Sequence, residues 1–94
     1  MTKIEKICGY YHMQSHEVTE IIKLMDDYLP RYYAATIQEI LKEEHEVEMD
    51  ARAIRNIRKG EVNNPLVFNL ILSYAQQIKT QLENLKKTAA TVSH

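Results

Sequence analysis

The chain has 94 residues, of which 45% are hydrophobic and 27% are charged, and its net charge is −1. These proportions are ordinary for a globular protein, and the length suits one domain built around one core. Two glycines and two prolines are few, which argues against a loop-rich or all-β fold. The sequence therefore predicts a single all-α domain, 1–94, made of about five helices.

The cysteine content and the apolar segments indicate the compartment. Cys8 is the only cysteine, so an internal disulfide is excluded and a reducing compartment is expected. The first fourteen residues contain no long apolar segment, so a secretory signal is not expected. The longest apolar stretch, 66–75, is far shorter than the ~20 residues of a membrane span. The sequence thus predicts a cytoplasmic protein that does not enter a membrane.

Residues 1–30 are expected to form an N-terminal helical segment. Within it, residues 3–12 are ambiguous, because their apolar side chains have helical spacing but Gly9 weakens a helix. A second helix is expected to start at Ser15, whose hydroxyl could cap it, and to end before Pro30. Apolar residues repeat along this helix at helical spacing: Val18, Ile21, Ile22, Met25, Tyr28 and Leu29.

Residues 31–76 are expected to hold the functional core of the domain, and 77–94 a C-terminal helix extension and tail. A third helix is predicted over about 31–44, with an inner stripe that includes Tyr33, Ile37, Ile40 and Leu41. A short fourth helix follows, with Asp50 as its N-cap and Gly60 just after its end. The last helix, capped by Asn64 and beginning at Pro65, is predicted to reach about residue 87, and the tail 88–94 is expected to fray.

The sign of the charge changes abruptly inside this central segment. Residues 39–50 contain six acids and one lysine, whereas residues 51–60 contain four bases and no acid. On a helical wheel the polar residues of the fourth helix share an arc about 100° wide. Ile54 and Ile57 lie opposite this arc, so we expect them to pack down against Ile37, Ile40 or Leu41. The opposite face would then present Arg52, Arg55, Asn56 and Lys59 to solvent, with Arg58 at the border.

The stretch 49–75 resembles the C-terminal half of the Cro/lambda-repressor-like helix-turn-helix family. The family pattern is a hydrophobic turn residue, an N-cap, two β-branched residues three apart, a glycine, a polar link, a proline and an apolar-Ala pair. The matching residues here are Met49, Asp50, Ile54, Ile57, Gly60, Pro65 and Tyr74-Ala75. Two departures stand out: residues 42–48 lack the glycine of the usual tight turn, and the link before the proline is longer than usual. The resemblance implies a helix-turn-helix core in 31–76, with 33–41 as the scaffold helix.

The resemblance also implies a function. Proteins similar to Cro-like repressors are small bacterial or phage transcriptional regulators that bind double-stranded DNA sequence-specifically. The family's base-facing and phosphate-facing positions fall on the residues that the helical wheel places outside. Arginine pairs with guanine and asparagine with adenine in the major groove, while side chains near helix ends suit phosphate oxygens. The expected DNA contacts are Arg52, Arg55, Asn56, Arg58, Lys59, Asn63 and Asn64.

A second class of function remains open. A protein-interaction module, such as an antirepressor or inhibitor, would use the acidic segment 39–50 and the long last helix. Glu46 and Glu48 beside the proposed groove favour this alternative, and the basic face could also be no more than a solvated surface. Cys8, His12 and His16 would suit zinc only on one continuous helix, and a fourth ligand is missing. We therefore expect no metal, cofactor or small-molecule ligand, and nothing in the sequence supports an enzyme.

The last helix is longer than its own domain requires. Past residue 75 its apolar stripe continues through Ile78, Leu82 and Leu85, spaced by four and three residues. Paired helices bury such a seam in a coiled coil. The sequence predicts a homodimer built on these residues. The alternative is that the helix over 16–29 folds back and covers the seam within one chain.

Overall fold

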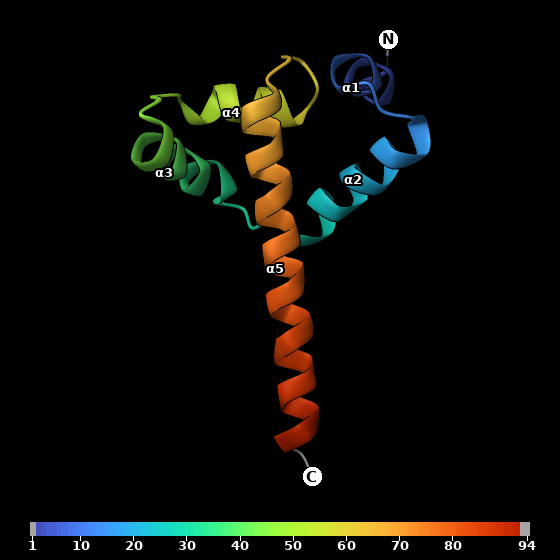
Figure 1. Ribbon diagram of the computed structural model, residues 1–94, viewed down its shortest axis with the longest axis vertical. Helices are drawn as coiled ribbons and strands as arrows, with labels where there is room; N and C mark the ends of the chain where they lie inside the picture. Colours follow the sequence, from blue (N-terminus) through green and yellow to red (C-terminus); the bar gives the residue numbers. More distant parts are fainter. Residues whose placement is uncertain (1, 93–94) are drawn as a thin grey trace.

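The computed structural model of the chain describes residues 2–92, and in that range the chain forms five α-helices and no β-strand. In chain order the helices are α1 (Lys3–Tyr11), α2 (Ser15–Tyr28), α3 (Tyr33–His45), α4 (Ala51–Arg58) and α5 (Pro65–Val92). Figure 1 shows α1 and α2 on one side of α5, α3 on the other, α4 crossing behind the first turns of α5, and the second half of α5 extending far beyond them. The predicted all-α bundle with a long C-terminal helix is confirmed.

The buried side chains of residues 2–92 form one core to which every helix contributes. α1 supplies Ile7, while α2 supplies Val18 and Met25, so the N-terminal segment is built into the same core as the rest. The other helices supply Tyr33, Ala34, Ile37, Leu41, Ile54, Ile57, Val67, Phe68, Ile71 and Ala75. Removing this apolar surface from water is the main force that holds the helices in one arrangement.

The start of α2 differs by one residue from the predicted one. Gln14 is the N-cap, and its N–H donates a hydrogen bond to Glu17 Oε1 at 3.2 Å. Ser15 is therefore the first helical residue, and the prediction that it caps the helix was wrong. The physical reason is that a carboxylate three residues after the cap satisfies the amide of the cap itself, which fixes Gln14 in that place. The predicted end is right, since α2 stops at Tyr28, just before the Leu29-Pro30 pair.

The turn between α3 and α4 spans residues 46–50 and is made without glycine. Glu46 takes the left-handed conformation, with a φ of 55°, at the place where a helix most often ends on glycine. The Gln38 side chain of α3 donates to the Met49 carbonyl oxygen at 3.0 Å and fixes the far side of the turn. Asp50 Oδ1 then accepts the Ala53 N–H at 2.7 Å, which confirms the predicted N-cap of α4.

Gly60 ends α4 for two physical reasons. Its φ is +80°, the left-handed conformation that glycine adopts without strain. The Gly60 N–H donates a hydrogen bond to the Ile57 carbonyl oxygen at 3.1 Å, and the Glu61 N–H donates one to the Asn56 carbonyl oxygen at 3.0 Å. Together these two bonds form a Schellman motif. A Cβ built on this glycine would lie 3.0 Å from Ile7 Cγ1 of α1. The predicted role of Gly60 is confirmed, and the close approach of α1 adds a second constraint that the local sequence does not show.

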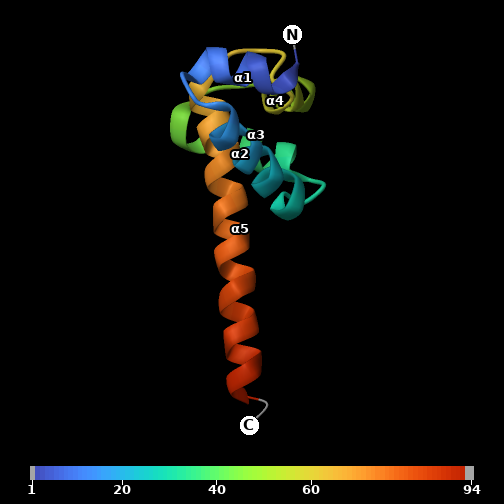
Figure 2. The ribbon, with the colours of Figure 1, turned by 90° about the vertical axis from the view of Figure 1, so that its right-hand side faces the viewer.

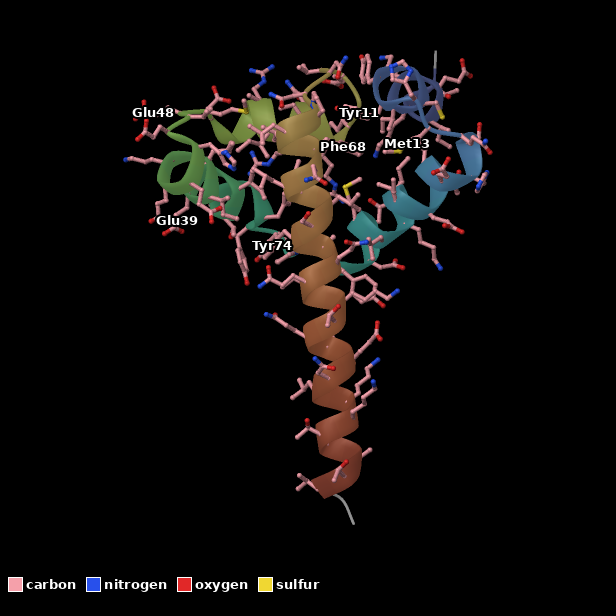
Figure 3. The ribbon with its side chains drawn as sticks, viewed as in Figure 1. Tyr11, Met13, Glu39, Glu48, Phe68 and Tyr74 are labelled. Atoms are coloured by element: carbon pink, nitrogen blue, oxygen red, sulfur yellow. The ribbon has the colours of Figure 1, made fainter. Side chains whose placement is uncertain are left out.

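α1 docks on the junction between α4 and α5 through Tyr11. The Tyr11 ring stacks on Phe68 with a centroid separation of 4.6 Å, and Figure 3 shows the two side chains together. The Asn64 N–H donates to Tyr11 Oη at 3.1 Å, while Asn64 Oδ1 accepts the Val67 N–H and caps α5 as predicted. Burial raises the pKa of the Tyr11 hydroxyl, against the opposite effect of the Asn64 N–H, and nearby Tyr10 raises it further.

α5 continues to Val92, beyond the predicted end at 87. The expected fraying of the tail was wrong for residues 88–92, and residues 93–94 lie outside the described part of the chain. Two alanines at 89–90, the strongest helix formers, favour propagation of a helix that is already nucleated. Although α5 has 28 residues, none of the helices within 2–92 is apolar enough over a sufficient length to cross a membrane.

Candidate nucleic-acid interface

α4 has the two faces that its periodicity predicts. Ile54 and Ile57 are 0% and 1% exposed and belong to the same buried cluster as Ile37 and Leu41 of α3. Because both isoleucines pack into the core, they set the orientation of α4 about its own axis. On the outer side, Arg52, Arg55 and Lys59 are exposed, and Asn56 is half-buried.

A groove lies beside the C-terminal end of α4 and gathers residues that are far apart in the sequence. Lys3 of α1 and Arg31 of the α2–α3 link line it together with Arg55 and Lys59 of α4. Among the described residues, its lining includes five cations, Arg58 being the fifth, and one carboxylate, that of Asp26. Clustered cations beside low-dielectric protein raise the local positive potential. Lys3 and Arg31 were not predicted as site residues.

The Arg58 side chain makes contacts with two other helices. Its Nη2 lies 2.9 Å from Asp26 Oδ1 of α2, and its guanidinium lies over the Tyr33 ring of α3 at 4.9 Å from the centroid. The sequence placed Arg58 at the border of the polar arc, and from that border the side chain turns towards α2 and α3. Arg58 therefore joins three helices, and its guanidinium is engaged within the chain as well as lining the groove.

The two asparagines before α5 also separate into different environments. Asn64 is half-buried, and its side-chain oxygen is used to cap α5 at 3.1 Å from the Val67 nitrogen. A cap of this kind stabilises the helix start, and it uses the side-chain oxygen of Asn64 but not its NH2 group. Asn63 is exposed in the link after α4 and keeps its predicted place at the rim of the basic face.

The acidic residues lie at the other end of α4. Glu46 and Glu48 precede α4 and are exposed, as is Glu39 on α3. Figure 3 shows Glu39 and Glu48 on the α3 side of the molecule, whereas α1, which contributes Lys3 to the groove, lies across α5. The sign change seen in the sequence thus separates the acids of 39–50, which lie before the first turn of α4, from Arg55, Arg58 and Lys59 at its last turn.

The residues considered for zinc do not share a helix. Cys8 lies in α1, His12 follows its last residue with a φ of 54°, and His16 lies in α2. Within residues 2–92 no group of three or more His, Cys, Asp or Glu side chains is arranged to hold a metal ion.

Exposed guanidinium and ammonium groups on one face bind phosphate oxygens through short, charge-assisted hydrogen bonds. Arginine on the exposed face of a helix also reaches the edges of bases in the major groove. Comparisons of the chain with known protein families, with curated proteins and with solved structures find no match, so the site is defined by its own geometry.

Proposed function

We propose that the protein binds double-stranded DNA sequence-specifically, with α4 in the major groove, and acts as a small transcriptional regulator of bacterial or phage type. The observation that carries the proposal is the orientation of α4: exposed Arg52, Arg55 and Lys59 are backed by fully buried Ile54 and Ile57. A second helix anchored on a scaffold helix, with its outer face free, is the arrangement by which helix-turn-helix proteins read DNA. Here α3 is the scaffold and α4 is the recognition helix.

The groove supports the same proposal by its charge. The chain as a whole carries −1, so its positive region is local to the C-terminal end of α4. In this proposal Lys3 and Arg31 bind backbone phosphates beside the bases that Arg55 and Asn56 contact. Phosphate contacts supply affinity and fix the register of the protein, whereas base contacts supply specificity. The acidic residues before α4 are consistent with a duplex that lies nearer the last turn of α4 than the first.

Variants of the two kinds of contact should behave differently. Preferred duplexes would first be selected from a randomised pool, and binding would then be measured by fluorescence anisotropy at several salt concentrations. Arg55→Ala or Asn56→Ala should cost about 1–3 kcal/mol on the preferred duplex and relax the preference at one base pair. Lys3→Ala or Arg31→Ala should weaken preferred and random duplexes alike and reduce the salt slope by about one unit each.

Lys23→Ala, on the exposed side of α2, is the control and should change neither quantity. If the parent selects no sequence from the pool and binds random duplex no better than the variants, the DNA assignment is wrong. The acidic surface of α3 would then favour the protein-interaction module that the sequence leaves open.

A further inference from the structure

The second half of α5 is not covered by the rest of its own chain. α2 packs along the first half of α5, and the groove between them is lined by Leu24 of α2 and by Leu72, Gln76 and Lys79 of α5. From residue 80 to residue 92 every position is exposed. Figures 1 and 2, at right angles, both show this part of α5 protruding alone. Of the predicted seam, Ile78 is half-buried, whereas Leu82 and Leu85 are left 43% and 63% exposed and are not covered by α2.

An apolar stripe passes without a break from the core to this exposed part. Ile71, Ile78, Leu85 and Val92 follow one another at intervals of seven residues. Ile71 is 0% exposed, Ile78 is half-buried, Leu85 is 63% and Val92 is 78% exposed. With Leu82 between them, the spacing alternates between four and three, which is the repeat of a two-stranded coiled coil. The stripe is therefore buried in the core at Ile71 and exposed to solvent at Leu85 and Val92.

We infer that the exposed half of α5 pairs with the same helix of a second copy of this chain, in parallel, as a short two-stranded coiled coil. A helix of this length is marginal in water when nothing packs against it, because few of its residues gain more than backbone hydrogen bonds. Pairing buries Leu82 and Leu85 and supplies the missing packing. The pairing does not depend on the proposed DNA binding.

The charges beside the seam select the parallel orientation. Lys79 and Lys86 each follow a seam residue directly and lie on the same flank, whereas Gln81 lies on the other flank. In a parallel pair the two flanks face each other, so Lys86 of one copy lies near Gln81 of the other. In an antiparallel pair equal flanks meet, and Lys79 of each copy would face Lys86 of the other. Two such like-charge contacts disfavour the antiparallel pair.

The parallel orientation also suits the position of α4. α4 contacts α5 and lies beside its first turns, at the end opposite the seam. Two parallel copies would hold both α4 helices at the same end of the assembly, where one duplex could meet both. Antiparallel copies would hold the two α4 helices at opposite ends of the assembly, further apart than the length of one α5, which is about 40 Å at 1.5 Å per residue.

Sedimentation equilibrium tests the pairing with no DNA present. The parent should be a dimer at tens of micromolar, and Leu82→Glu combined with Leu85→Glu should be a monomer. Because both leucines are already exposed in one chain, the double variant should keep the helical circular dichroism spectrum of a folded protein. Gln77→Glu combined with Asn84→Glu adds the same charge to exposed positions off the stripe and should remain a dimer. A monomeric parent, or a dimeric Leu82/Leu85 variant, overturns the pairing.

Oxidative cross-linking tests the orientation. In a Cys8→Ser background, which removes the one native thiol, the Leu85→Cys variant should form a disulfide with itself across the seam. Equivalent seam positions in a parallel pair lie within the Cα separation that a disulfide needs. The Thr80→Cys control faces away from the seam and should not cross-link. A link that forms only between mixed Leu82→Cys and Leu85→Cys chains would overturn the parallel arrangement.

Discussion

Truncating Ile54 or Ile57 to alanine should destabilise the protein by about 2–5 kcal/mol each. The two side chains are 0% and 1% exposed, so each truncation removes buried methyl groups and leaves a cavity between α4 and α3. A domain of this size has a total stability of only about 5–15 kcal/mol, and either variant should lose a large share of it. Urea unfolding followed by circular dichroism gives the free energy of unfolding directly.

Arg52→Ala is the matched control for these truncations, since it lies on the exposed face of the same short helix. Its effect should stay within about 0.5 kcal/mol. Ile54→Ala and Ile57→Ala variants that unfold at the urea concentration of the parent would show that the isoleucines face solvent. The basic face of α4 would then be turned inward, and the candidate interface would be misplaced.

Gly60→Ala should cost about 1–3 kcal/mol of stability. The residue has a φ of +80°, which strains any side chain, and the added Cβ would lie 3.0 Å from Ile7 Cγ1 and 3.4 Å from the Lys3 carbonyl oxygen. Relief would require α1 to move away from the end of α4, which would also open the groove that contains Lys3. The cost therefore combines backbone strain with lost packing of a fully buried isoleucine.

The other glycine of the chain provides a control of opposite sign. Gly9 lies inside α1, and a Cβ added there would meet nothing within 4 Å. Gly9→Ala should therefore stabilise the protein by roughly 0.5–1 kcal/mol, because alanine is the better helix former. Urea unfolding of both variants beside the parent measures the contrast. A Gly60→Ala variant that is stabilised as much as Gly9→Ala would show that neither the left-handed φ nor the contact with Ile7 restrains Gly60.

Local signals in the sequence were sufficient to predict most of the helix boundaries and the faces of α4. Asp50, Gly60 and Asn64 act at helix ends through their own backbone or side chain, so their residue types alone indicate their places. The periodicity of Ile54 and Ile57 in the same way identifies the buried side of a short helix. These features depend on interactions between residues that are close together in the sequence, so they can be predicted without knowledge of the fold.

Features that depend on the packing of distant segments could not be predicted in this way. Lys3 and Arg31 join the basic groove only because the start of α1 and the α2–α3 link come to lie beside the end of α4. Phe68 continues the apolar stripe of α5, but the Tyr11 ring that stacks on it comes from α1, 57 residues earlier in the chain. The Arg58 side chain contacts Asp26 and Tyr33, which belong to two other helices. No local pattern identifies these partners.

The turn before α4 is one of the two departures from the helix-turn-helix pattern that the sequence resembles. The sequence lacks a turn glycine, and the left-handed position is taken by Glu46 instead, at a φ of 55°. The bond from Gln38 to the Met49 carbonyl and the cap made by Asp50 complete the turn without it. The missing glycine therefore lengthens the turn but does not prevent α4 from packing on α3.

The most direct test of the central claim compares two double variants of equal net charge for binding to a duplex of about 20 base pairs. Arg55→Ala with Lys59→Ala removes two cations from the outer face of α4, and Lys23→Ala with Lys87→Ala removes two exposed cations from α2 and α5. Anisotropy would be measured at two salt concentrations. The account predicts that the α4 variant loses affinity together with about one unit of salt slope, from the phosphate contact of Lys59, while the control binds like the parent. Equal binding by both variants would contradict the assignment of α4 as the DNA-binding helix.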